Sequence, residues 1–160
     1  MEKIDSFRGE YFFLSNFYEI PVTYDGITYE NNEAAFQAQK VAPRKTKKVL
    51  SDERLAFCHL NPSEAKKLGR KIPLRKDWEA IKVKVMEDIV LAKFSQHPEL
   101  AEKLLATGNA HLEEGNSWGD KVWGTVGGVG ANNLGKILMR VRETLREREK
   151  KGEHTGKNTL

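Results

Sequence analysis

The chain has almost no cysteine and no long apolar run. Cys58 is the single cysteine among 160 residues, so no internal disulfide can form. No stretch approaches the roughly 18 consecutive apolar residues that a membrane-spanning helix needs. The opening residues, Met1 to Asp5, are followed by no apolar segment of the kind that signal peptides contain. We therefore expect a protein of a reducing compartment, the cytoplasm.

Strong charge is also absent outside one region. The net charge is +4, and residues 140–160 hold seven Lys or Arg against four Glu, which leaves the rest of the chain nearly neutral. We interpret this basic helix end and tail as a solvated surface that complements the helix macrodipole, not as a nucleic-acid-binding stripe. No linker rich in Gly, Pro or Ser divides the chain. The sequence therefore predicts one domain over residues 1–150 and a disordered polar tail over residues 151–160.

Hydrophobic periodicity and turn residues predict an α+β fold, a mostly helical single domain with a small antiparallel sheet. Asp25-Gly26, between Val22–Tyr24 and Ile27–Tyr29, is typical of a β-hairpin turn. Helices are expected over residues 33–41 (capped by Asn31 or Asn32), 45–58, 62–69, 77–95, 99–106 and 133–149. Residues 107–131 are expected to form a loop. The apolar stripes of the two longest helices contain Trp78, Ile81, Val85, Ile89 and Ala92, and Leu134, Ile137, Leu138, Val141 and Leu145.

One predicted short helix carries three polar side chains whose functional groups suit catalysis. Glu33, Gln37 and Lys40 have the spacing i, i+4, i+7, which places them on one helical face. The pattern is typical of an amphipathic helix with its polar side in water. It also suits a site for breaking a ribose–base bond. A carboxylate can move a proton or stabilise an oxocarbenium ion, an amine can attack the anomeric carbon, and an amide can hold sugar hydroxyls. Spacing alone does not decide between these interpretations.

The loop over residues 114–135 is the second candidate region. Its glycines, among them Gly128 and Gly130, allow close approach of the backbone to a ligand and lead into a helix whose N-terminus favours a phosphate. Trp118 and Trp123 offer flat faces for a base, and Asp120 can orient a ribose hydroxyl or a water. The alternative is a structural loop whose tryptophans fill the core beneath it.

Several common ligand-binding and metal sites are excluded because their sequence motifs are absent. Gly135-Lys136 is followed by Ile137, so the phosphate-binding pattern G-x-x-x-x-G-K-[ST] is absent. The pair Gly128 and Gly130 lacks the third glycine of a dinucleotide-binding fingerprint. The four histidines are scattered without ligand spacing. We expect no metal site and no cofactor.

Seven segments, in order over roughly residues 8–147, are similar to the NADAR (YbiA-like) family. They are Leu14-Ser-Asn-Phe17, Glu33-Ala-Ala-Phe-Gln-Ala-Gln-Lys40, Leu68-Gly-Arg70, Leu74-Arg-Lys-Asp-Trp78, Ala92-Lys-Phe94, Gly115-Asn-Ser-Trp-Gly-Asp-Lys-Val-Trp-Gly124 and Gly130-Ala-Asn-Asn-Leu-Gly-Lys-Ile-Leu-Met139. The resemblance implies the family's own mostly helical α+β fold and an N-glycosidase activity. One departure is Ala34-Ala35, where the family often has an aromatic residue or His after the glutamate, and this leaves more room near the site.

The resemblance also implies roles for residues. Glu33 matches the family's functional glutamate, Lys40 its lysine proposed to act through a Schiff base, and Asp120 its loop aspartate, and we expect these three to be catalytic. A neutral Lys40 amine requires a site that excludes water, because burial lowers a lysine pKa while a charged Glu33 raises it. The predicted substrate-binding residues are Asn16, Gln37, Arg70, Trp78, Trp118, Trp123, Gly128, Gly130 and Asn132.

The predicted function is hydrolysis of the bond between a base and a phosphorylated ribose. Members of the family act on ribosylamino-pyrimidine phosphates of riboflavin synthesis or on ADP-ribose attached to guanine in nucleic acid. We therefore expect a small phosphoribosyl or ADP-ribosyl substrate, with ADP-ribosylated nucleic acid as another possible one and no membrane partner. The near-neutral body favours the free small molecule. The alternative is a non-catalytic module that binds ADP-ribose or NAD.

Overall fold

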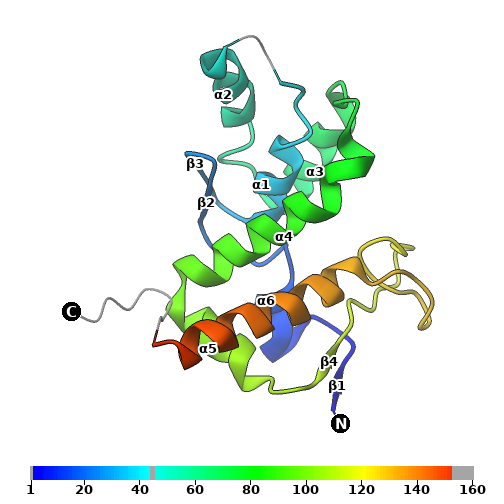
Figure 1. Ribbon diagram of the computed structural model, residues 1–160. Helices are drawn as coiled ribbons and strands as arrows, with labels where there is room; N and C mark the ends of the chain where they lie inside the picture. The colour runs from blue at the N-terminus through cyan, green and yellow to red at the C-terminus, as the bar shows by residue number, and fades with distance from the viewer. Residues whose placement is uncertain (1, 44–45, 153–160) are drawn as a thin grey trace. The chain divides into compact units, whose positions relative to one another are not determined.

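The computed structural model describes residues 2–43 and 46–152 (Figure 1). The chain divides into two compact units, which we call unit 1 (up to Ser15, and from Phe94 onwards) and unit 2 (Asn16–Lys93). Within the described ranges, no helix combines the length and apolar character needed to cross a membrane. Residues 153–160, most of the tail predicted to be disordered, lie outside the described part of the chain.

Unit 2 holds a hairpin and most of the helices. Strands β2 (Val22–Tyr24) and β3 (Ile27–Tyr29) pair antiparallel, as predicted. Asp25 and Gly26 both have positive φ, 50° and 84°, the geometry of the turn that suits a two-residue hairpin loop. The helices that follow are α1 (Asn32–Ala38), α2 (Lys47–Leu55), α3 (Pro62–Lys71) and α4 (Trp78–Gln96), the last of which continues into unit 1.

The starts of these helices follow local rules. Asn31 caps α1, because its side chain accepts from the amide of Ala34 at 2.8 Å. Asn61 and Glu64 form a complete capping box at the start of α3.

The buried face of α4 differs in part from the predicted stripe. Trp78 and Ile89 are buried as expected, whereas Ile81, Val85 and Ala92 are only partly buried, and the face is completed by Met86, Val90, Lys93 and Phe94.

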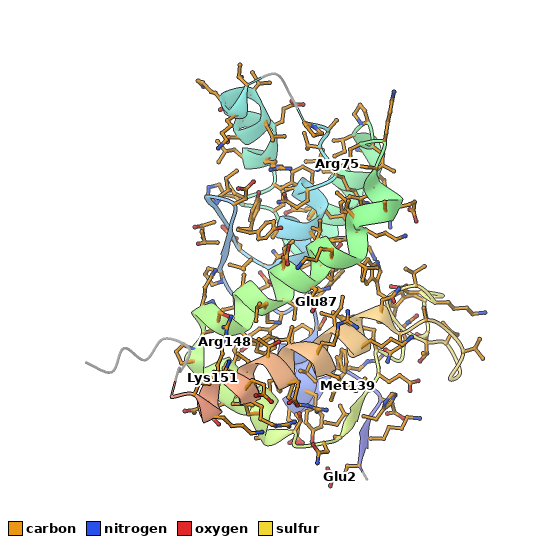
Figure 2. The ribbon with its side chains drawn as sticks, in the orientation of Figure 1. Glu2, Arg75, Glu87, Met139, Arg148 and Lys151 are labelled. Carbon is orange, nitrogen blue, oxygen red and sulfur yellow. The ribbon has the colours of Figure 1, made fainter. Side chains whose placement is uncertain are left out.

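The predicted end of the first helix is wrong. Helix α1 ends at Ala38, and the amides of Gln39, Lys40 and Val41 each bond to the carbonyl three residues earlier, which tightens the chain into turns. The chain leaves the helix because Val41 bridges to Leu74 and the Lys40 carbonyl accepts from the backbone amide of Arg75 at 3.1 Å. Arg75 is labelled in Figure 2. Lys40 therefore lies two residues beyond the end of the helix that carries Glu33.

Unit 1 contains a second sheet that the sequence did not predict. Strand β1 (Lys3–Ile4) pairs parallel with β4 (His111–Leu112), which lies inside the segment expected to be loop. The helices of this unit are η1 (Gly9–Leu14, a 3₁₀ helix), α5 (Pro98–Ala106) and α6 (Asn133–Lys150). The predicted inward face of α6 is confirmed, since Leu134, Ile137, Leu138, Val141 and Leu145 are all buried.

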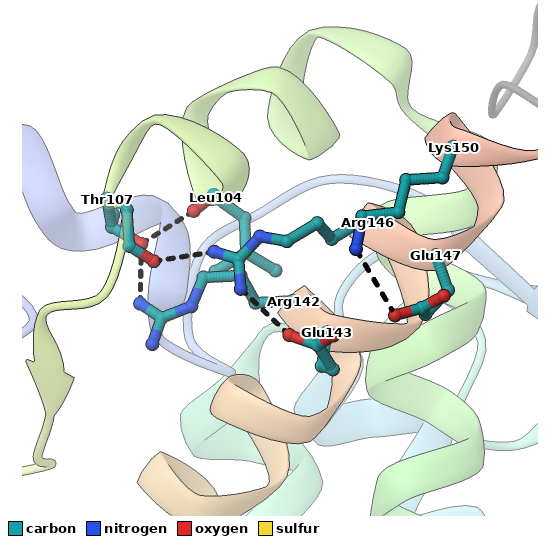
Figure 3. Close-up of polar contacts among 8 residues, drawn as sticks. Leu104, Thr107, Arg142, Glu143, Arg146, Glu147 and Lys150 are labelled. Carbon is teal, nitrogen blue, oxygen red and sulfur yellow. Dashed lines mark hydrogen bonds and ion pairs between the residues drawn. The ribbon is translucent and has the colours of Figure 1, made fainter.

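Two arginines of α6 stabilise the end of α5 (Figure 3). The Arg142 guanidinium donates to the Thr107 hydroxyl at 2.8 Å, and Arg146 donates to the Gly108 carbonyl at 2.7 Å. The Thr107 hydroxyl in turn donates to the Leu104 carbonyl at 2.6 Å, one of the last helix carbonyls, which lack partners within the helix and carry partial negative charge. The composition of the basic C-terminal helix indicated a solvated surface. Part of this helix has another role, because Arg142 is buried against α5.

Candidate active site

Helix α1 is buried along its whole length, including its polar residues. The residues Glu33 and Gln37 are only 8% and 5% exposed. The Gln37 Nε2 group donates to Glu33 Oε2 at 2.6 Å, a short bond between an amide and a carboxylate one helical turn apart. The interpretation of an ordinary amphipathic helix with its polar side in water is therefore wrong. A buried carboxylate is expensive unless it is paired or functional, so Glu33 is a candidate for chemistry.

The Lys40 amine lies in an environment that favours its neutral form. Burial lowers the pKa of Lys40, and the positive charges of Arg70, Lys66 and Lys82 act in the same direction. The negative charge of Glu33 opposes them by raising this pKa. The net direction is downward, as expected of an amine that acts as a nucleophile. The side chain of Lys40 is partly buried.

An aromatic pair borders the same site. The Lys40 amine lies 6.0 Å from the ring centre of Trp78, at the limit of a cation–π contact. Trp78 packs on Phe36 of α1 with ring centres 5.0 Å apart and is itself only 4% exposed. The indole of Trp78 therefore lies between the core at Phe36 and the neighbourhood of the Lys40 amine. Its burial leaves little of the ring for stacking on a base.

Asn16 and Arg70 also belong to unit 2 but differ in role. The carbonyl of Asn16 accepts from the Glu33 amide at 3.2 Å, and its side chain accepts from Asn32 at 3.3 Å. The Asn16 amide donates to the sulfur of Met86 at 3.4 Å. Asn16 is buried and holds the start of α1 in place. Arg70, in contrast, is exposed at the end of α3, where it contributes positive charge to the Lys40 environment.

The loop of unit 1 is organised by Asn116 and Asp120. The Asn116 side chain donates to the carbonyls of Glu114, Asp120 and Thr125 and accepts from the Asp120 amide. Asp120 Oδ1 accepts from the amides of Val122 and Trp123 at 3.0 and 2.9 Å. Through this oxygen, Asp120 has a structural role that the sequence did not predict, since it holds the turn that carries Trp123.

The backbone amides at the N-terminus of α6, predicted to bind a phosphate, instead bond to the preceding loop. The amides of Asn132, Asn133 and Leu134 all donate to loop carbonyls, those of Gly124, Val122 and Trp123. These amides are therefore not available to an anion without breaking the loop. Gly128 and Gly130 are exposed and have φ of 84° and 149°, so they serve the tight path of the loop.

Asn132 joins the loop over residues 114–131 to the start of α6 through hydrogen bonds. Its backbone is left-handed with φ 52°, its Oδ1 accepts from the Glu114 amide at 3.0 Å, and its Nδ2 donates to the Leu112 carbonyl at 3.0 Å. Asn132 is buried, so its side chain serves the fold. The two tryptophans differ: Trp123 is partly buried, whereas Trp118 is 61% exposed. The alternative that Trp118 fills a core is therefore wrong.

Sequence reasoning missed Gly69 of α3. A Cβ at this position would overlap the side-chain oxygen of Gln37, so the glycine makes room for that amide. The sequence carried little signal for it, because Gly69 ended the predicted helix 62–69 and glycine is common at helix ends, whereas α3 in fact runs on to Lys71. Within residues 2–43 and 46–152, no three His, Cys, Asp or Glu side chains gather as a metal site would require.

Unit 2 thus combines a buried carboxylate with a partly buried amine whose pKa is lowered, which is typical of an enzyme that uses acid–base or nucleophilic chemistry. The chain belongs to the NADAR family, whose domain matches residues 5–146.

Relatives and a solved structure agree with this assignment. The chain is 41% identical over 143 residues to N-glycosidase YbiA from Escherichia coli (strain K12), covering 88% of this chain and 85% of that protein. It is 43% identical over 139 residues to a riboflavin biosynthesis protein from Vibrio vulnificus, covering 84% of this chain and 36% of that longer protein. The NMR structure of Escherichia coli YbiA matches with a TM-score of 0.79 at 36% identity, over 98% of this chain and 94% of that one. The predicted family, the α+β fold and the N-glycosidase class of enzyme are confirmed.

Proposed function

We propose that the protein hydrolyses the N-glycosidic bond between a base and a phosphorylated ribose, with Glu33 and Lys40 as its catalytic residues. The observation that carries the proposal is the Lys40 amine, whose pKa is lowered by burial within electrostatic reach of the buried Glu33 carboxylate. A non-catalytic module that binds ADP-ribose or NAD has no need for such a pair. Burying an amine and a carboxylate lowers the stability of the fold, and a binding module gains nothing from that loss.

The chemistry follows from the two groups. The neutral amine of Lys40 attacks C1 of the ribose, and the electron pair of the C1–N bond leaves with the base, which takes a proton from Glu33. Glu33, now a carboxylate, takes the proton from the new ammonium and passes it to the ring oxygen as the C1–O bond breaks, which gives a protonated Schiff base between Lys40 and the open-chain ribose phosphate. Water then adds to the imine carbon and gives a proton to Glu33, and the amine leaves the resulting carbinolamine, which regenerates Lys40 and frees the ribose phosphate aldehyde. In its charged form, Glu33 also stabilises positive charge that develops at C1.

The substrate that we propose is a ribosylamino-pyrimidine phosphate of the riboflavin pathway. The name of the Vibrio vulnificus relative supports this choice. The near-neutral charge of the chain outside residues 140–160 also supports a free small molecule, because a nucleic-acid backbone is usually held by several Lys or Arg contacts. The catalytic role of Asp120 and the substrate-binding roles of Trp118 and Trp123 remain predictions, as does the cytoplasmic location.

The test uses purified protein with two substrates in separate reactions: the ribosylamino-pyrimidine phosphate and DNA that carries ADP-ribosylated guanine. Mass spectrometry follows release of the base or of ADP-ribose, and borohydride added during turnover reduces a Schiff base to a stable adduct. We expect release from the first substrate and an adduct on Lys40. Lys40→Ala should abolish both, whereas Lys67→Ala, at an exposed lysine of α3, should retain them.

The other outcomes are equally informative. Release from the DNA alone would replace the proposed substrate with ADP-ribosylated guanine. Release by wild-type protein with no adduct would contradict the role of Lys40 as nucleophile. Binding of ADP-ribose or NAD without release from either substrate would favour the non-catalytic module.

A further inference from the structure

The amide nitrogen of Gln37 is engaged within the protein. Gln37 lies one turn after Glu33 on α1, and its Nε2 donates to Glu33 Oε2 at 2.6 Å. Both side chains are buried, and the opposite end of the amide, Oε1, is buried without a hydrogen-bond partner. Gln37 was predicted to hold sugar hydroxyls. Its position instead directs its donor at the carboxylate and its acceptor at α3.

The place of this amide is set by Gly69. A Cβ on Gly69 would overlap Gln37 Oε1 and would come within 2.8 Å of Gln37 Cδ. Gly69 lies in the interior of α3 and does not have a positive φ, so backbone freedom does not explain the glycine. Glycine is a poor helix former, and the remaining reason for its presence is the missing side chain. The absence of a Cβ gives the Gln37 amide the space in which it reaches Glu33.

We propose that Gln37 is a positioning residue that holds the Glu33 carboxylate for catalysis, and that Gly69 acts through Gln37 by leaving room for its amide. The inference rests on the proposed function, because it assigns Glu33 to the reaction. A carboxamide does not titrate, so it donates to the carboxylate at every working pH. Its hydrogen bond fixes one oxygen of Glu33 and thereby the direction of the other.

Gln39 provides a matched control. It is also a buried glutamine at the end of α1, but its Nε2 donates to the Ala35 carbonyl at 3.0 Å and not to Glu33. We expect Gln37→Met, which keeps the volume but removes the donor, to lower kcat by about 10–100-fold with little change in KM. Gln39→Met should leave kcat within about threefold of wild type, because the structural loss is similar and the carboxylate is untouched. Equal effects of the two substitutions would overturn the proposal.

A double-mutant cycle tests Gly69. Gly69→Ala should lower kcat in the wild-type background, because the new Cβ displaces the Gln37 amide. In the Gln37→Ala background, which vacates the space, the same substitution should cause no further loss. Independent, additive losses would show that Gly69 does not act through Gln37. Gln37→Glu adds a pH signature, since it donates only when protonated, and its activity should fall with rising pH where that of wild type does not.

A structural readout separates this inference from the proposed function. In ¹⁵N NMR spectra, the side-chain amide of Gln37 should exchange slowly with water in wild type and should shift in Glu33→Ala and in Gly69→Ala. An amide signal that is unchanged in Gly69→Ala would overturn the inference whether or not the enzyme turns over. Failure of wild-type protein to release base from either substrate, with these shifts present, would refute the proposed function alone. If Gly69→Ala does not fold, the kcat of Gln37→Met and the amide shift in Glu33→Ala still test the role of Gln37. The role of Gly69 is then tested by folding itself, which Gln37→Ala should restore to Gly69→Ala, and a double variant that stays unfolded would overturn that role.

Discussion

Lys93 makes the stability of this protein depend on pH in an unusual direction. Its side chain is 1% exposed, and burial lowers its pKa from 10.5 to about 7. The amine lies 5.4 Å from the ring centre of Tyr18, a contact that favours the charged form and opposes part of this shift. Below about pH 7 the folded and unfolded chains both bind the proton, so the full cost of burying the charge is present. Between about pH 7 and 10.5 only the unfolded chain holds it, so stability rises with pH.

The magnitude follows from the displacement of the pKa. One pKa unit corresponds to about 1.4 kcal/mol, so the cost at low pH is up to ~5 kcal/mol, of which ~3 kcal/mol should be recovered between pH 6 and pH 9. Lys93→Met removes the charge and keeps a flexible apolar chain of similar length. The variant should therefore be more stable than wild type at pH 6, and its advantage should shrink by ~3 kcal/mol at pH 9.

Urea unfolding followed by circular dichroism, at several pH values between 6 and 9, measures this difference. Other titrating groups contribute equally to both proteins and cancel in the comparison. Lys67→Met, at an exposed lysine of α3, serves as the control and should differ from wild type by a constant amount. A constant difference between Lys93→Met and wild type over this range would refute the reasoning, because it would mean that Lys93 keeps an ordinary lysine pKa in the folded protein.

Three further predictions concern the site and its supports. Because burial lowers the pKa of Lys40, the rate of the first turnover should rise with pH and reach its plateau below the ordinary lysine pKa of 10.5. A plateau reached only above pH 10.5 would contradict a lowered pKa of Lys40. Asn132→Gly keeps the positive φ but loses both side-chain hydrogen bonds, so thermal melts should report a loss of about 1–3 kcal/mol; an unchanged melting temperature would show that these bonds do not support the loop. Trp78→Ala should destabilise by about 3–5 kcal/mol, whereas the exposed Trp118→Ala should stay within about 0.5 kcal/mol, and equal losses in urea unfolding would contradict the burial difference.

The site itself was only partly readable from the sequence. Family resemblance identified Glu33 and Lys40, and in the structure Glu33 is buried while Lys40, in the same unit, is partly buried with a lowered pKa. The pairing of Gln37 with Glu33 follows from i, i+4 spacing, but the burial of both depends on how α3 covers α1. The structural roles of Asp120 and Asn132 were not predicted, since each depends on backbone groups that the folded loop alone brings within bonding distance.

Features governed by neighbouring residues were determined by the sequence. Asp25-Gly26 specifies the hairpin because its turn needs two positive φ values, and Asn61 with Glu64 specifies the start of α3 because both partners lie within one helical turn. Features that join distant segments were decided by the tertiary structure. The pairing of Lys3–Ile4 with His111–Leu112 has no local signal, since each strand has only two residues. Likewise, α1 ends before Lys40 because Val41 bridges to Leu74, a contact that no local pattern around Lys40 encodes.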